Sequence, residues 1–159
     1  MIRALLAWEA FWWIYEKAER RRIFAQGRAQ ARRADKPLLV VGEPFGQYPC
    51  PDGSQDVLLD LREKSACANH LKASIEDLRP IADKHFGAAV VQHTLEHVCD
   101  PGRALAELRR VADVVLIGYP RPWRLATYLV PGHRWIMFPR GDGWRFVQLY
   151  GRCNLATRY

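Results

Sequence analysis

The chain has few cysteines and no long hydrophobic run among its 159 residues. The cysteines are Cys50, Cys67, Cys99 and Cys153. None of them forms a C-x-x-C pair, so the sequence predicts neither a zinc knuckle nor a redox pair, and it favours free thiols in a reduced, cytoplasmic protein. The longest apolar stretch, residues 4–15, is interrupted by Glu9 and is too short to span a bilayer. It also lacks the basic start and cleavage pattern of a secretory signal peptide.

Basic residues outnumber acidic residues at both ends of the chain. Residues 1–36 carry a net charge of +5 and residues 121–159 a net charge of +6, whereas residues 37–120 carry −4. Two basic ends favour an anionic partner, which would be nucleic acid, a membrane surface or a phosphorylated substrate. Ordinary solvated arginines explain the same charges equally well.

The first 36 residues are interpreted as an N-terminal amphipathic basic helix, and residues 37–159 as the main domain. Residues 4–33 contain no proline, and their first glycine is Gly27, which predicts one long helix with an apolar first half and a basic second half. Such a helix could lie at a membrane interface, which would make the protein peripheral at the membrane. We favour packing on the domain's own sheet or on a second subunit, and the second case would make a homo-oligomer.

Residues 88–119 predict a strand, a helix and a second strand. Residues 88–92 and 114–117 are short apolar runs that suit buried strands. Asp100 and Pro101 are a typical helix start, an N-cap followed by proline at the first helical position. The apolar residues that follow recur at helical spacing: Ala104, Leu105, Leu108, Val111 and Ala112. This βαβ unit predicts a parallel strand pair with a right-handed crossover.

Residues 93–120 resemble the second half of a small class I methyltransferase domain of the type 11 kind, a family that uses S-adenosylmethionine (SAM). The matching residues are Leu95, Glu96, His97, Val98, Asp100, Pro101, Leu108, Arg109, Arg110, Val111 and Pro120. The resemblance implies an α/β, Rossmann-like fold. We therefore expect a mostly parallel sheet with helices on both faces, a C-terminal antiparallel hairpin, and the N-terminal helix before it.

The resemblance also implies residues that bind SAM. After a first strand at residues 38–41, Gly42 and Gly46 take the places of the first and last glycines of the family's loop. Pro44 stands at the middle glycine's place, and Glu43 would supply the carboxylate that the family usually has at the position of Val40.

Further cofactor contacts follow by position along the chain. Asp60, at the end of a predicted second strand, would accept hydrogen bonds from the ribose hydroxyls. Glu76 or Asp77, after the third strand, would bind the adenine amino group, and Gln92 would border the methionine end. The alternative for Asp60 is a surface carboxylate that caps the next turn.

Two histidines follow the strand at residues 88–92, in the pattern H-x-x-E-H. The resemblance places His93 beside the methionine end and His97 on the substrate side, where a neutral imidazole can take a proton. The same pattern occurs in zinc peptidases, but there it lies on a long helix and needs a distant third ligand. Because the pattern here stands between a strand and Asp-Pro, we predict no metal site. A polar turn at Glu96 and His97 is the plainer alternative.

The C-terminal segment supplies the expected substrate side. Residues 135–138 and 144–150 predict a β-hairpin, and residues 121–130 a short helix or lid. The residues assigned to the substrate side are Tyr119, Arg121, Trp123 and His133. Interleaved basic and aromatic side chains of this kind can hold a phosphate or stack on a base, and they also occur on ordinary surfaces.

Two functions are compatible with the sequence. The first is a SAM-dependent methyltransferase that acts on a small or anionic acceptor, with His93 or His97 as a base where the acceptor must lose a proton. The second is a catalytically degenerate member of the fold that binds nucleic acid, a membrane surface or a protein through its basic ends. The intact segment 88–119 fits both functions, because it forms mainly core.

Overall fold

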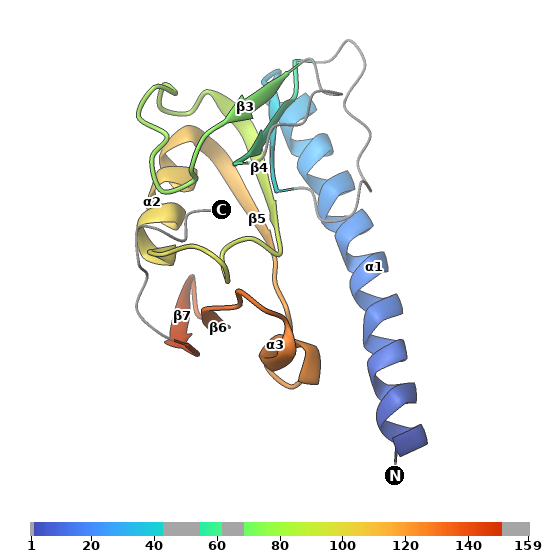
Figure 1. The fold of residues 1–159 in the computed structure, drawn as a ribbon. Helices are drawn as coiled ribbons and strands as arrows, with labels where there is room; N and C mark the ends of the chain where they lie inside the picture. The colour runs from blue at the N-terminus through green and yellow to red at the C-terminus, as the bar shows by residue number, and fades with distance from the viewer. Residues whose placement is uncertain (1, 43–54, 62–68, 151–159) are drawn as a thin grey trace.

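The computed structural model describes residues 2–42, 55–61 and 69–150. Its elements in chain order are α1 (Ile2–Arg33), β1 (Leu38–Val41), β2 (Val57–Asp60), β3 (His70–Lys72), β4 (Phe86–Gln92), α2 (Pro101–Val111), β5 (Ala112–Gly118), α3 (Leu125–Leu129), β6 (Trp135–Arg140) and β7 (Gly143–Gln148). Figure 1 shows the sheet between α1 and α2, with α3 and the β6–β7 hairpin below it.

The central sheet has five parallel strands in the order β3-β2-β1-β4-β5. β1 lies in the middle and pairs with β2 on one side and β4 on the other, with Val40 opposite Leu58 and Val90. The strand order reverses between β1 and β4, so the carboxyl ends of these two strands form the topological switch point at which such folds bind ligands.

Successive residues of the strands enter two separate cores, one on each face of the sheet. Leu39 and Val41 of β1 pack in a cluster with residues of α2, whereas Leu38 and Val40 pack in a second cluster with Ile23 and Ala31 of α1. Alternation of this kind follows from the two-residue period of a strand. Helices therefore cover both faces, as the sequence predicted.

The second half of α1 packs closely on the sheet. A Cβ atom added to Gly27 would lie 2.3 Å from Cγ2 of Val90, and one added to Gly87 of β4 would lie 2.8 Å from Cα of Ala31. The two glycines thus allow the helix and strand backbones to approach one another. The expected helix is confirmed, and it packs on the sheet, which is one of the two arrangements that we favoured.

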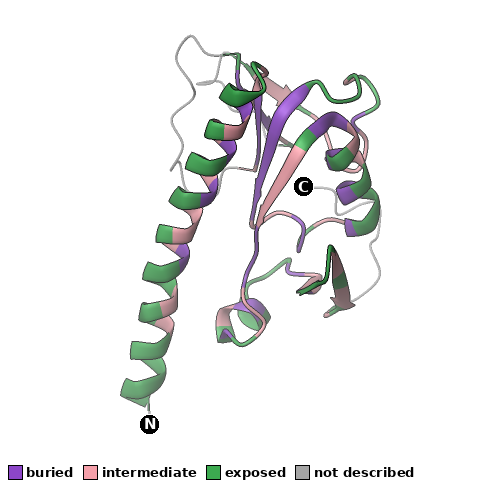
Figure 2. Cartoon of the chain, turned by 180° about the vertical axis from the view of Figure 1, so that it is seen from behind, coloured by how far each residue is buried: buried purple, intermediate pink, exposed green. Residues whose placement is uncertain are grey.

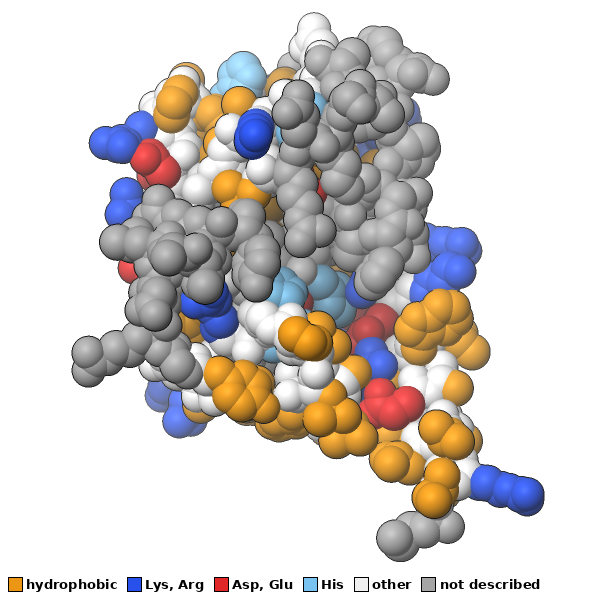
Figure 3. All heavy atoms as spheres, viewed as in Figure 1, with side chains coloured by type: hydrophobic (Ala, Val, Ile, Leu, Met, Phe, Trp, Pro, Cys, Tyr) orange, Lys and Arg blue, Asp and Glu red, His pale blue; other side chains and the backbone are white. Residues whose placement is uncertain are grey.

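The first half of α1 extends beyond the sheet (Figures 1 and 2). Its exposed apolar side chains gather on the lower part of the helix in Figure 3 and include Ile2, Leu5, Leu6, Phe11, Trp13 and Ile14. None of the helices in the described part of the chain has both the length and the apolar character needed to cross a membrane.

Local signals placed most elements correctly. Asp100 caps α2 by accepting a hydrogen bond from the Arg103 backbone N–H at 2.9 Å, with Pro101 next, as predicted. The C-terminal hairpin is confirmed as β6 and β7, and it forms a separate two-stranded sheet. The helix expected over residues 121–130 is shorter, at Leu125–Leu129.

Cys99 differs from the expectation. It is disulfide-bonded, so the prediction of a free thiol is wrong at this position. Cys50, Cys67 and Cys153 lie outside the described residues. Disulfides persist mainly in oxidising compartments, and the cytoplasmic location that we inferred from free thiols therefore stays a prediction.

Candidate functional site

Three of the predicted cofactor residues lie at the carboxyl edge of the sheet. Gly42 follows β1, Asp60 ends β2 and Gln92 ends β4, and these strands are neighbours in the sheet. The Gly42 N–H donates to the Leu59 carbonyl at 2.9 Å, which fixes Gly42 beside Asp60. Glu43 and Gly46 lie outside the described residues.

Gly42 has a conformation that glycine favours. Its φ is +66°, and an added Cβ would lie 2.4 Å from the Thr94 hydroxyl oxygen. The local geometry therefore explains the first glycine of the predicted loop, because any other residue would be strained and would collide with Thr94.

The other predicted cofactor side chains already have partners within the protein. The Gln92 amide is almost fully buried and donates to the Arg20 carbonyl of α1 at 2.9 Å. One oxygen of Glu76 accepts from the Asp100 backbone N–H at 2.6 Å, which ties the segment after β3 to the start of α2. Asp77 is held by Arg79, whose hydrogen bond lowers the pKa of this carboxyl to about 2.

Glu96 is the centre of a second cluster, just after β4. Its side chain is fully buried, and neither carboxylate oxygen has a hydrogen-bond partner. Three imidazoles surround one of these oxygens. The distances to Oε1 are 3.6 Å from Nδ1 of His93, 4.0 Å from Nε2 of His97 and 3.9 Å from Nε2 of His133.

The backbone positions these four side chains precisely where two segments cross. Residues 93–99 form a turn after β4, which His93 starts with a φ of +49°. The Glu96 carbonyl accepts from the Arg134 N–H at 2.7 Å, which holds the residue after His133 against this turn. Sequence reasoning was right that a helix does not pass through the H-x-x-E-H pattern.

Hydrogen bonds orient two of the imidazoles. Nδ1 of His97 lies 3.0 Å from the Gly132 carbonyl, and Nδ1 of His133 lies 2.8 Å from the Thr127 carbonyl. A carbonyl can only accept, so both Nδ1 atoms carry the proton. In the neutral rings, the lone pair of each histidine is therefore on Nε2, which faces Glu96.

Burial shifts the protonation of the whole cluster toward neutral forms. It raises the pKa of Glu96 to about 8, because the carboxylate would be charged in an apolar interior. It lowers the pKa of His93 well below the ordinary value, with Arg20 and the neighbouring imidazoles adding to the effect. Burial likewise lowers the pKa of His97 and His133.

The three imidazoles line a cavity of about 480 Å³ between the turn after β4, α1 and the α3 segment. Its other lining residues are Trp13, Glu16, Lys17, Arg20, Pro120, Arg124, Ala126, Thr127 and Val130. Figure 3 shows histidine side chains reaching the surface near the middle of this face. Of the residues predicted for catalysis and the substrate side, His93, His97 and His133 therefore come together.

The predicted substrate-side residue Arg121 and its neighbour Arg124 are both paired with carboxylates of α1. Arg124 pairs with Glu9 at 2.9 Å and with Glu16, and Arg121 pairs with Glu19. These ion pairs balance both guanidinium charges within the protein. The segment from residue 121 to 124 consequently serves to attach α1 to α3.

Tyr119 and Trp123 lie outside the cavity lining. Tyr119 is buried against Trp144, with ring centroids 4.8 Å apart, and its hydroxyl accepts from Arg121 at 2.7 Å. Trp123 is half exposed and stacks edge-to-face on Trp12 of α1 at 5.4 Å.

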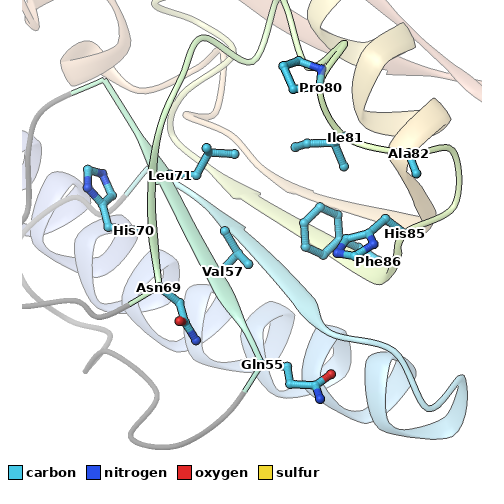
Figure 4. Close-up of a pocket in the computed structure, with 10 residues that line it drawn as sticks. All are labelled: Gln55, Val57, Asn69, His70, Leu71, Pro80, Ile81, Ala82, His85 and Phe86. Carbon is cyan, nitrogen blue, oxygen red and sulfur yellow. The ribbon is translucent and has the colours of Figure 1, made fainter.

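A second cavity, of about 730 Å³, lies at the opposite edge of the sheet (Figure 4). It is lined by the first residues of β2, β3 and β4, namely Val57, His70 and Phe86, and by the loop before β4. Because ligands of this fold class bind at the carboxyl ends of the strands, this cavity is at the wrong edge for the cofactor.

Sequence reasoning missed Glu16, Arg20 and the central role of Glu96. Glu9 and Glu16 stand seven residues apart on an otherwise apolar half-helix, so they share a face, and this spacing was the available signal. For Glu96, the signal was the H-x-x-E-H pattern, whose third imidazole comes from a remote position.

Comparisons with known proteins agree with the fold. Residues 37–113 match the sequence model of a family described as "Methyltransferase domain". No curated protein and no solved structure matches the chain significantly.

Proposed function

We propose that this protein transfers a methyl group from SAM to a small-molecule acceptor, a proposal supported by the match of residues 37–113 to the sequence model of a methyltransferase domain. The observation that carries the proposal is the position of the histidine-lined cavity. It opens at the end of β4, and β1 and β4 are the two strands that flank the switch point of a sheet ordered β3-β2-β1-β4-β5.

The described residues fit SAM at this edge. Gly42 offers a backbone without a side chain, and Asp60 offers a carboxylate on the next strand, which suits a ribose diol. Glu43, Gly46, Glu76, Asp77 and Gln92 remain proposed as contacts on the basis of the resemblance alone. When bound, SAM supplies an electrophilic methyl group, and the protein's part is to orient the acceptor for in-line attack.

His97 is the better proposed base of the two histidines. Its imidazole lines the cavity and its side chain is 40% exposed, whereas that of His93 is 14% exposed. The lowered pKa of His97 keeps the ring neutral at pH 7, so Nε2 can accept a proton from an acceptor hydroxyl or amine. A base matters only for acceptors that must lose a proton.

Calorimetric titration of the whole chain with SAM and with S-adenosylhomocysteine tests the proposal. We expect both to bind, and we expect Asp60→Asn to weaken binding about 10- to 100-fold, because a charged hydrogen-bond acceptor is lost. Asp113→Asn is the matched control, since Asp113 pairs with Lys36 on another part of the surface. A folded protein that gives no heat with millimolar ligand would refute the enzyme and leave the degenerate binding module.

A further inference from the structure

We propose that Glu96, His97 and His133, together with His93, form a binding site for a divalent transition-metal ion such as Zn²⁺. The first observation is the state of Glu96. This carboxyl is fully buried, and neither of its oxygens has a hydrogen-bond partner. A buried polar group is normally paired, and buried carboxylates commonly pair with a cation or coordinate a metal.

The second observation is the spacing of the candidate ligand atoms. One ligand atom from each of Glu96, His97 and His133 lies within 4.8 Å of the others. The nitrogens of the three imidazoles lie 3.6–4.0 Å from the same carboxylate oxygen. Ligands about 2.0–2.2 Å from a shared tetrahedral ion are roughly 3.4 Å apart, so small side-chain adjustments suffice to enclose an ion.

The third observation is independent of the carboxylate. His97 and His133 each place Nδ1 against a backbone carbonyl, at 3.0 and 2.8 Å, and direct Nε2 toward the cluster. Metal-binding histidines almost always have their other ring N–H held in this way, which fixes both the tautomer and the orientation of the lone pair. Gly132 supplies one of these carbonyls, and a Cβ there would lie 3.3 Å from His97 Nδ1.

The chemistry of the donors selects the kind of ion. Imidazole suits Zn²⁺, Fe²⁺, Ni²⁺ and Cu²⁺, whereas Mg²⁺ and Ca²⁺ prefer all-oxygen sites. The site also faces three cations, since Lys17 and Arg20 of α1 and Arg124, the residue before α3, line the same cavity. The Arg124 charge is offset by Glu9 and Glu16.

A metal ion at this site would lie in the cavity that we propose for the acceptor. All three imidazoles line the space in which an acceptor would bind, so an ion held by them would contact that acceptor. A bound ion would also occupy Nε2 of His97, and the metal role and the general-base role exclude one another at this atom. Metal binding is measured without SAM and without methyl transfer, so its outcome is independent of the proposed function.

The experiment titrates the metal-free whole chain with Zn²⁺ against a chromophoric chelator, and with Co²⁺ while the visible spectrum is recorded. We expect one tight equivalent of Zn²⁺ and the absorption bands of a nitrogen-coordinated Co²⁺. His97→Gln and His133→Gln should each weaken Zn²⁺ binding by about 100-fold or more, beyond the 10- to 100-fold typical of losing an outer-shell partner. His85→Gln is the matched control, because His85 is an exposed imidazole at the other cavity.

Two results would overturn the proposal. One is that the wild-type chain binds Zn²⁺ with a dissociation constant in the micromolar range or weaker, and that adding the ion leaves its melting temperature unchanged. The other is tight binding that His97→Gln and His133→Gln leave unchanged while circular dichroism shows both variants folded. The Zn²⁺ titration of the wild-type chain tests the proposal without the variants, so it remains decisive if a variant fails to fold.

Discussion

The protonation of Glu96 predicts a specific dependence of stability on pH in the metal-free protein. Its pKa is about 8 in the folded chain and 4.5 in the unfolded chain, so between these values the folded state holds a proton that the unfolded state has released. Stability is then greatest at low pH within this window and falls as pH rises. Below pH 6.5 the histidines act in the opposite direction, since their folded pKa values are lowered and the unfolded chain takes up more protons there.

Glu96 dominates the titration of the cluster between pH 6.5 and 8. The folded histidines are neutral throughout this interval, and unfolded histidines, half protonated at pH 6.5, lose their protons over its lower part. That histidine contribution is the same in two proteins that differ only at residue 96, so it cancels in their comparison. Over 1.5 pH units, one proton per molecule changes the free energy of unfolding by about 2 kcal/mol. For a chain of this length, a loss of about 2 kcal/mol lowers the melting temperature by roughly 4–8 °C.

Glu96→Gln provides the comparison, because a neutral amide has the shape of the protonated carboxyl and does not titrate. With chelator present, urea unfolding should show the variant already more stable than wild type at pH 6.5, because the unfolded wild-type chain has released the Glu96 proton by then. Between pH 6.5 and pH 8 this difference in the free energy of unfolding should widen by about 2 kcal/mol. If both proteins lose stability in parallel across this interval, Glu96 is not protonated in the folded state and the reasoning fails.

Two other substitutions test how α1 is attached. Gly87→Ala should lower the free energy of unfolding by about 1–3 kcal/mol in urea titrations, because the added Cβ would lie 2.8 Å from the Ala31 backbone. An unchanged urea midpoint would show that α1 is free to move away from the sheet. Arg124→Met should cost about 3–5 kcal/mol, since Arg124 is 10% exposed and its loss leaves the buried Glu16 unpaired. Arg79→Met, at a pair in which Arg79 is 79% exposed, should cost much less than Arg124→Met by the same urea titration, because water screens the pair, and equal losses for the two variants would contradict the assigned burial.

Elements with local signals could be predicted from the sequence. Asp100 and Pro101 mark the start of α2 because an N-cap and an N1 proline act within one turn of the helix. β4 is buried on both faces, so its apolar run was visible without knowledge of its neighbours. These features depend on residues only a few positions apart.

The candidate site depends on contacts that no local pattern encodes. His133 meets His97 because the segment after α3 returns to the turn after β4. There the backbone carbonyl of Glu96 accepts hydrogen bonds from the backbone N–H groups of Arg134 and Trp135. The two histidines are more than thirty residues apart in the sequence, and no metal was predicted because the H-x-x-E-H pattern does not lie on a long helix. Similarly, Arg121 looked free for an anion because its carboxylate partner, Glu19, lies about one hundred residues away.

The cavity is built partly from the segment that matches the family model and partly from residues outside it. His93, Glu96 and His97 lie within residues 37–113, which match the methyltransferase domain. Glu16 and Arg20 come from α1, before that range, and His133 comes from after it. The matched segment therefore supplies the strand end and the turn, while the flanking segments close the cavity and complete the imidazole cluster. Under the proposed methyltransferase function, acceptor preference should accordingly change more with substitutions in α1 and in the segment that carries His133 than with substitutions in the sheet, as measured by methyl transfer to a panel of acceptors.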